Sequence, residues 1–127
     1  MEEKNNTMFS RGVRGAITLE NNTKEDIKSA VVELLQEMII KNEINTEDIS
    51  FAIFTLTDDL NADFPAKYAR LNCGFSKVPM MCYHELNVEN SLKKCLRILL
   101  NINTNKTQNE IKHIYLKEAK ILREDIK

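Results

Sequence analysis

The segment Leu92-Lys-Lys-Cys-Leu-Arg-Ile-Leu-Leu-Asn-Ile-Asn-Thr104 places one arginine, Arg97, inside a strongly apolar run. The leucines at 96, 99 and 100 have helical spacing, whereas the apolar residues at 98, 100 and 102 alternate as in a strand. We predict a strand. A guanidinium keeps its charge when buried and then needs an anion. Arg97 must therefore meet either an internal carboxylate or a ligand.

Two further arginines lie beside apolar residues. Arg14 occurs in Arg11-Gly-Val-Arg-Gly-Ala-Ile17, and Arg123 follows Ala119-Lys-Ile-Leu122. For Arg14, as for Arg97, pairing with an internal Asp or Glu is the structural alternative to ligand binding.

Composition limits the class of protein. The chain has 127 residues, 43% hydrophobic and 29% charged, as expected for one globular domain. Its net charge of -1 gives no basic field for nucleic acid or an anionic membrane surface. We find no apolar stretch of membrane-spanning length and no signal peptide, so we expect a cytoplasmic protein. The three cysteines are expected to be reduced thiols.

The first half of the chain predicts a β-α-β unit. The range 9–19 reads as a strand whose glycines, Gly12 and Gly15, mark a bulge or a close backbone approach. A capping-box pattern from Thr23 to Asp26 precedes apolar residues at helical spacing as far as Ile39. The range 49–56 then has the apolar character of a strand in a sheet interior.

The second half contains shorter elements. Asp63 and Pro65 are typical of an N-cap and a first turn, which predicts a short helix over 64–71. A strand is predicted over 77–82. Thr107-Gln-Asn-Glu110 is a second capping-box pattern and predicts a short helix before the apolar run 114–116.

Six segments, in order and without insertion or deletion, resemble the small monofunctional chorismate mutases of the trimeric bacterial type. The resemblance extends from Met8 to about Asp125, nearly the whole chain. The segments are Arg11-Gly-Val-Arg-Gly-Ala-Ile-Thr18, Phe64-Pro-Ala-Lys67, Val78-Pro79 with Cys82 and Glu85, Leu92-Lys-Lys-Cys-Leu-Arg97, His113-Ile-Tyr-Leu116 and Leu122-Arg123.

The resemblance implies an α/β (mixed α+β) fold. Each chain would be a single domain with a mixed sheet and short helices, and three chains would form a pseudo-α/β-barrel homotrimer with sites between neighbours. Residues 8–127 would form the domain, and residues 1–7 are expected to be a disordered N-terminal extension.

The reaction implied is the rearrangement of chorismate to prephenate, a step toward phenylalanine and tyrosine. One C–O bond breaks as a C–C bond forms within one molecule, so no cofactor, metal or nucleophile is required. Such a site must hold a flexible dianion in a compact conformer and place positive charge where the ether oxygen becomes negative.

The resemblance also implies a role for each site residue. Arg97 would be the central cation, and Arg14 and Tyr115 would hold a substrate carboxylate. Glu85, with Cys82, would bind the ring hydroxyl. The remaining substrate contacts would be apolar walls, Phe64 and Leu122, and cations at the mouth, Lys67, Arg70 and Arg123.

Other interpretations remain open. By itself, Tyr115 in Ile-Tyr-Leu is more typical of a core tyrosine with a satisfied hydroxyl. Cys82, His84 and Glu85, with His113 as a further ligand, are compatible with a nucleophilic or metal site. The fold could serve another small-molecule reaction, or bind a metabolite without turnover. Arg97 and Glu85 facing one cavity would distinguish a chorismate mutase from another small-molecule enzyme on the same fold.

The sequence departs from the family pattern beside the site. Met81 stands where a threonine is familiar, and Tyr83 and His84 replace other residues between Cys82 and Glu85. We further expect residues 123–127, which are polar and end the chain, to act as a mobile gate over the site.

Overall fold

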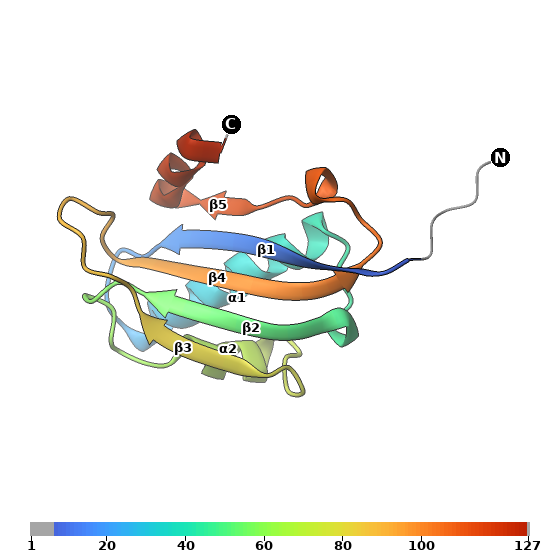
Figure 1. Ribbon diagram of the computed structural model, residues 1–127. Coiled ribbons are helices and arrows are strands. Elements are labelled where there is room, and N and C mark those ends of the chain that lie inside the picture. Colours follow the sequence, from blue (N-terminus) through green and yellow to red (C-terminus); the bar gives the residue numbers. More distant parts are fainter. Residues whose placement is uncertain (1–6, 127) are drawn as a thin grey trace.

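The computed structural model describes residues 7–126 of the chain, with side chains as far as residue 122. Strand β4 (Cys95–Thr104) lies at the centre of a sheet in the order β3-β2-β4-β1-β5 (Figure 1). The alternation of apolar residues in β4 thus predicted the correct element, although its first residue is 95 and not 92. Residues 1–6 of the expected N-terminal extension lie outside the described range.

Strand β1 (Phe9–Thr18) pairs antiparallel with β4 in an uninterrupted register. The bulge considered for this strand is therefore absent from that pairing. The other reading of its glycines is confirmed at Gly15, where a Cβ atom would overlap Sδ of Met38. The short β5 (Ile114–Leu116) pairs parallel with the opposite edge of β1.

Strand β2 (Ile49–Leu56) pairs antiparallel with β4 and parallel with β3 (Met80–His84). The predicted β-α-β unit is present, but β4 lies between its two strands and joins them. Strand β3 begins at residue 80, three residues later than predicted. An irregularity in register occurs in β2, between Ile49 and Phe51.

Helix α1 (Lys24–Lys41) begins as predicted, with the Thr23 hydroxyl accepting a hydrogen bond from the Asp26 amide at 3.1 Å. Helix α2 (Pro65–Asn72) differs at its start, because its N-cap is Phe64 and not Asp63. The Asp63 carboxylate instead accepts hydrogen bonds from the Phe64 amide at 2.8 Å and the Tyr68 hydroxyl at 2.7 Å. Asp63, one residue before the N-cap, therefore stabilises the first turn of α2 through its side chain.

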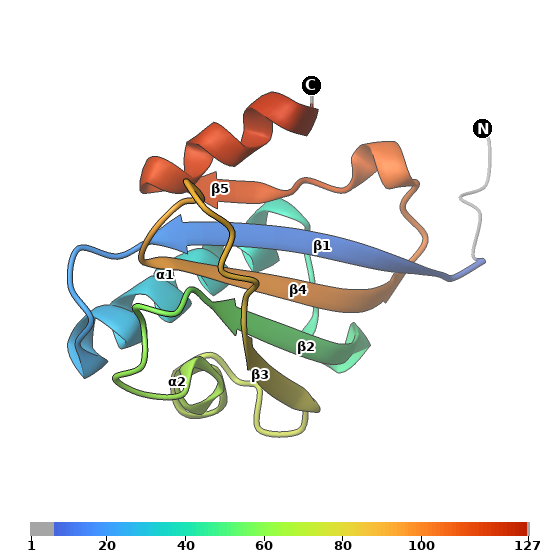
Figure 2. The same ribbon diagram turned by 60° about the vertical axis from the view of Figure 1, so that its left-hand side comes forward.

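The helices α1 and α2 cover the same face of the sheet (Figure 2). The core lies between these helices and the sheet, and it includes Leu34 and Phe54, both fully buried. Apolar side chains of β1, β2 and β4 point into this layer at every second position. None of the described helices is long and apolar enough to cross a membrane.

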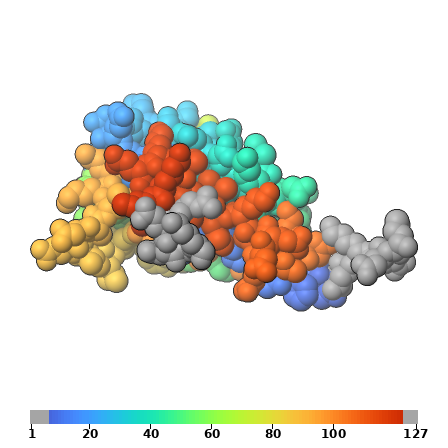
Figure 3. Space-filling view, turned by 90° about the horizontal axis from the view of Figure 1, so that it is seen from above, coloured from blue at the N-terminus to red at the C-terminus, as the bar shows by residue number. Residues whose placement is uncertain are grey.

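On the opposite face of the sheet, the described residues form a buried apolar cluster near β5. Helix η3 (Lys117–Ile126), which we did not predict, packs there around Ala119. Seen from above, it lies beside the loop between β3 and β4 at one end of the molecule (Figure 3). Two shorter 3-10 turns complete the chain, η1 (Thr46–Asp48) and η2 (Gln108–Glu110), the latter with the predicted capping box.

Candidate functional site

One row of paired residues crosses the open face of the sheet. In register, Tyr115 of β5 lies opposite Ala16 of β1, Ala16 opposite Arg97 of β4, Arg97 opposite Thr55 of β2, and Thr55 opposite Tyr83 of β3. Directly paired residues project to the same face of a sheet. The row therefore brings Arg97 and Tyr115 together although they are separated along the chain by a loop and η2.

Arg97 lies at the centre of this row beside a carboxylate. Its Nε is 3.1 Å from Oε2 of Glu85, and the two side chains are 35% and 16% exposed. The Thr55 hydroxyl donates a 2.7 Å hydrogen bond to the same oxygen. Arg97 Nε is buried, yet it donates no hydrogen bond of acceptable direction within the described part of the chain. The contact between Arg97 and Glu85 is thus an ion pair without a directed hydrogen bond.

Arg14 and Tyr115 lie on the other side of Arg97. The guanidinium carbon of Arg14 is 6.0 Å from the centroid of the Tyr115 ring. Tyr115 is 5% exposed, and its hydroxyl has no hydrogen-bond partner among residues 7–122. The backbone amide of Arg14 donates to Nδ1 of His113 at 3.0 Å, which fixes the strand beside β5. Backbone pairing of β1 with β4 and with β5 holds Arg14 and Tyr115 in place.

A cavity of about 230 Å³ opens among these side chains. Arg14, Arg97 and Tyr115 supply polar groups to its wall, and Ile53 and Leu99 supply apolar ones. Glu85, which we expected to face the same cavity as Arg97, is not part of its lining but contacts two residues that are, Arg97 and Thr55. Leu122, predicted as an apolar wall, packs against the small cluster that contains Tyr115.

Cys95 is buried near Arg97, two positions earlier on the same strand. Burial raises the pKa of its thiol to about 11, although the positive charge of Arg97 acts in the opposite direction. A thiol with so high a pKa is protonated and unreactive at neutral pH. Cys95 therefore packs with Ala16, Tyr115 and Ala119 and supplies no nucleophile.

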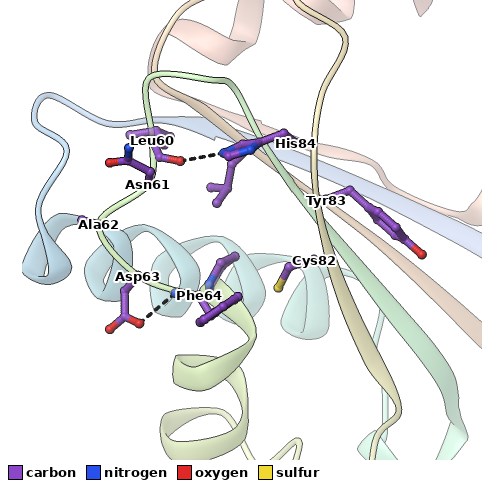
Figure 4. A pocket seen from close by; sticks show the side chains of 10 residues that line it. Leu60, Asn61, Ala62, Asp63, Phe64, Cys82, Tyr83 and His84 are labelled. Carbon is purple, nitrogen blue, oxygen red and sulfur yellow. Dashed lines mark hydrogen bonds between the residues drawn. The ribbon is translucent and has the colours of Figure 1, made fainter.

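The other predicted site residues form a second group at the edge of β3. Phe64 and Cys82 line a separate cavity of about 390 Å³ together with His84 (Figure 4). Cys82 pairs with Phe54 and packs against the main core, so it points to the helix-covered face. Within one chain the structure does not bring Cys82 beside Glu85, so their joint contact with the ring hydroxyl stays a prediction.

The predicted mouth residues also lie with this second group. The Lys67 amine is 3.2 Å from Oδ2 of Asp63, and Arg70 is exposed on the same helix. The side chain of Arg123, and with it the proposed gate over 123–127, lies outside the described side chains.

The alternative chemistries at Cys82 are not supported. His84 is the last residue of β3, at one edge of the sheet, where its Nε2 is 3.2 Å from the Leu60 carbonyl oxygen. His113 precedes β5 at the opposite edge, so it cannot join Cys82 and His84 around a metal. No group of three His, Cys, Asp or Glu side chains suited to a metal occurs in the described range. Burial raises the pKa of the Cys82 thiol, which opposes a nucleophilic role.

Comparison with known proteins identifies the family. A family model described as chorismate mutase type I matches residues 10–126. The chain belongs to this family.

Two curated chorismate mutases named AroH are similar over nearly their full length. The protein from Bacillus subtilis is 39% identical over 119 residues, covering 94% of each chain. The protein from Thermus thermophilus is 43% identical over 117 residues, covering 91% of this chain and 95% of its own. A solved chorismate mutase from Clostridium thermocellum superimposes with a TM-score of 0.85 at 43% identity, covering 87% of this chain and 98% of its own.

Thr55 of this chorismate mutase contacts the site and was missed from the sequence. We treated 49–56 as a uniformly apolar interior strand. In fact only one face of β2 is covered, and Phe51 on the other face is 39% exposed. The signal was Thr55 itself, a polar residue between Phe54 and Leu56, both of which are buried.

Proposed function

We propose that this chorismate mutase isomerises chorismate to prephenate on the open face of its sheet, with Arg97 as the catalytic cation. The rearrangement moves negative charge onto the ether oxygen as the C–O bond breaks. A fixed guanidinium at that oxygen stabilises the transition state more than the ground state. The rigid central strand β4 holds Arg97 in place for this task.

The observation that carries the proposal is a pair of buried donors that make no hydrogen bond among the described residues. Neither Nε of Arg97 nor the hydroxyl of Tyr115 makes a hydrogen bond within the described side chains. A buried polar group left unsatisfied costs about 1–3 kcal/mol, so such pairs are uncommon outside functional sites. With Arg14 they surround one cavity. A ligand with carboxylates and an ether oxygen would supply the missing acceptors.

Glu85 places a negative group beside the cation. Its carboxylate can accept a hydrogen bond from the hydroxyl of the substrate ring. Its charge also favours the electron-poor ring fragment of the transition state. Since Oε2 contacts both Thr55 and Arg97, Oε1 is the oxygen left for the substrate.

We further propose that the complete site forms between chains of a homotrimer. Phe64 is 70% exposed, and together with Cys82 and Lys67 it lies at the β3 edge, away from Arg97. If both groups of residues contact one substrate, the second group must come from a neighbouring copy. Large apolar side chains on the open face support such packing, namely Phe51, Met81, Tyr83 and Leu99.

A mixing experiment tests this arrangement. Arg97→Ala and Lys67→Ala chains would be purified separately, unfolded, mixed in equal amounts and refolded. If each site takes Arg97 from one chain and Lys67 from its neighbour, about a quarter of sites in random trimers regain both residues. Loss of chorismate absorbance would then recover to about a quarter of the wild-type rate, provided that each variant alone is impaired.

Each variant refolded alone serves as the control. Mixed chains that stay as inactive as the separate variants, while light scattering shows trimers, would place both residues in one chain. A fully active monomer under assay conditions would also contradict sites between chains. Inactivity of the well-folded wild-type chain would refute the proposed reaction itself.

A further inference from the structure

We propose that Thr55 is a positioning residue that keeps Glu85 from forming a bidentate hydrogen-bonded pair with Arg97. This inference rests on the proposed roles of Glu85 and Arg97 and adds a third side chain to their site. Thr55 lies opposite Arg97 in the register of β2 and β4, and its neighbour on β3 is Tyr83. It is thus placed between the strand of the arginine and the segment that carries the glutamate.

The hydrogen bond from Thr55 sets the orientation of the carboxylate. The hydroxyl donates to Oε2 of Glu85 at 2.7 Å, the same oxygen that lies 3.1 Å from Arg97 Nε. Although this second distance is short, its direction is not that of a hydrogen bond. The carboxylate therefore accepts a hydrogen bond from Thr55 and none from Nε of Arg97.

Arginine and carboxylate groups left to themselves prefer a bidentate pair, with two parallel N–H···O bonds. Such a pair would occupy two guanidinium donors that the substrate needs. Holding Oε2 at the Thr55 hydroxyl keeps the remaining guanidinium N–H groups for the substrate. It also leaves Oε1 as the acceptor for the ring hydroxyl.

The test compares Thr55→Val, which keeps the shape but removes the donor, with Thr55→Ser, which keeps the donor. We expect Thr55→Val to lower kcat/KM roughly tenfold, since hydrogen bonds to charged groups are among the stronger ones. Thr55→Ser should recover most of the loss. Circular dichroism melting should show that both variants remain folded, so that a general structural effect is separated from a positional one.

The role is isolated by repeating Thr55→Val in a Glu85→Ala background. With the carboxylate absent, loss of the hydroxyl should have no further effect on kcat/KM. Thr57→Val is the matched control, because the Thr57 hydroxyl donates to Asp59 at 2.6 Å and not to Glu85. The effect of Thr57→Val on kcat/KM should be the same with wild-type Glu85 and in the Glu85→Ala background.

An equal loss from Thr55→Val with and without Glu85, or no rescue by serine, would overturn the inference and leave the proposed reaction intact. Unchanged kcat/KM in Thr55→Val would likewise overturn the inference and leave the proposed reaction intact. If Glu85→Ala itself retained wild-type kcat/KM, the proposed role of Glu85 would fall, and this inference with it.

Discussion

Arg97 and Glu85 form their 3.1 Å ion pair across strand β2, which separates the strand of the arginine from the segment that carries the glutamate. The pair is neither fully exposed nor sealed in the core. An ion pair in such a place adds little stability on average, because desolvation offsets the attraction. Its position beside a cavity instead suits a pair that exchanges part of its contact for a ligand.

Replacement of Arg97 should abolish most catalysis without unfolding the protein. We expect Arg97→Ala to lower kcat by at least the roughly 10²–10³-fold seen when one preorganised donor is removed. Arg97→Lys should restore only part of it, because an ammonium lacks the planar fork of guanidinium. Steady-state kinetics on chorismate would measure both, and a variant with near wild-type kcat would make Arg97 a structural residue.

At Glu85, two substitutions separate hydrogen bonding from charge. Glu85→Ala should cripple turnover, whereas Glu85→Gln should keep an acceptor for the ring hydroxyl and lose the negative charge. We therefore expect Gln to retain substrate affinity better than Ala but to fall well below the wild-type kcat. Equal kcat for Gln and Glu would remove charge from the role of this residue.

The Tyr115 hydroxyl offers a test that distinguishes function from stability. Since it has no partner among the described side chains, Tyr115→Phe should not lower the melting temperature. If the hydroxyl binds a substrate carboxylate, KM should rise roughly tenfold or more. A lower melting temperature together with unchanged KM would identify an ordinary core tyrosine.

The close approach at Gly15 predicts a packing effect. Gly15→Ala should destabilise the fold by about 1 kcal/mol, because the new methyl group displaces the buried Met38 side chain. Gly12→Ala is the matched control on the same strand, since its Cβ would meet only Leu99 at 3.5 Å. Urea unfolding of the two variants compares them directly, and equal stability would refute the packing argument.

Asp63 predicts a pH dependence at the start of α2. The hydrogen bond from Tyr68, helped by the Phe64 amide and Lys67, lowers the pKa of this carboxyl from 3.8 to about 2. A carboxyl whose pKa is lower in the folded than in the unfolded protein stabilises the fold at pH values above its unfolded pKa. This contribution is lost as the pH falls through the folded pKa. Asp63→Asn should thus be less stable than wild type at about pH 6, with a smaller difference at about pH 3. Denaturant midpoints at both values would measure this, and a constant difference would exclude the carboxylate charge as its cause.

Much of the local structure could be predicted because its causes are local. The Thr23 cap and the apolar spacing after it define α1, and the alternation around Arg97 defines β4. The N-cap of α2 was placed wrongly at Asp63, because several neighbouring groups can donate hydrogen bonds to one carboxylate. Helix η3 was missed because its ordering comes from packing around Ala119 beside β5.

The sequence by itself determined the family, most of the elements and the residues that could carry the chemistry. Only the tertiary structure decided which of them meet. Strand periodicity divides side chains between two faces, but which face stays open depends on where α1 and α2 dock. That choice set Arg97, Glu85 and Thr55 together on one side and turned Cys82 to the other. Contacts between strands distant in the chain arise from this global pairing, which local sequence patterns do not specify.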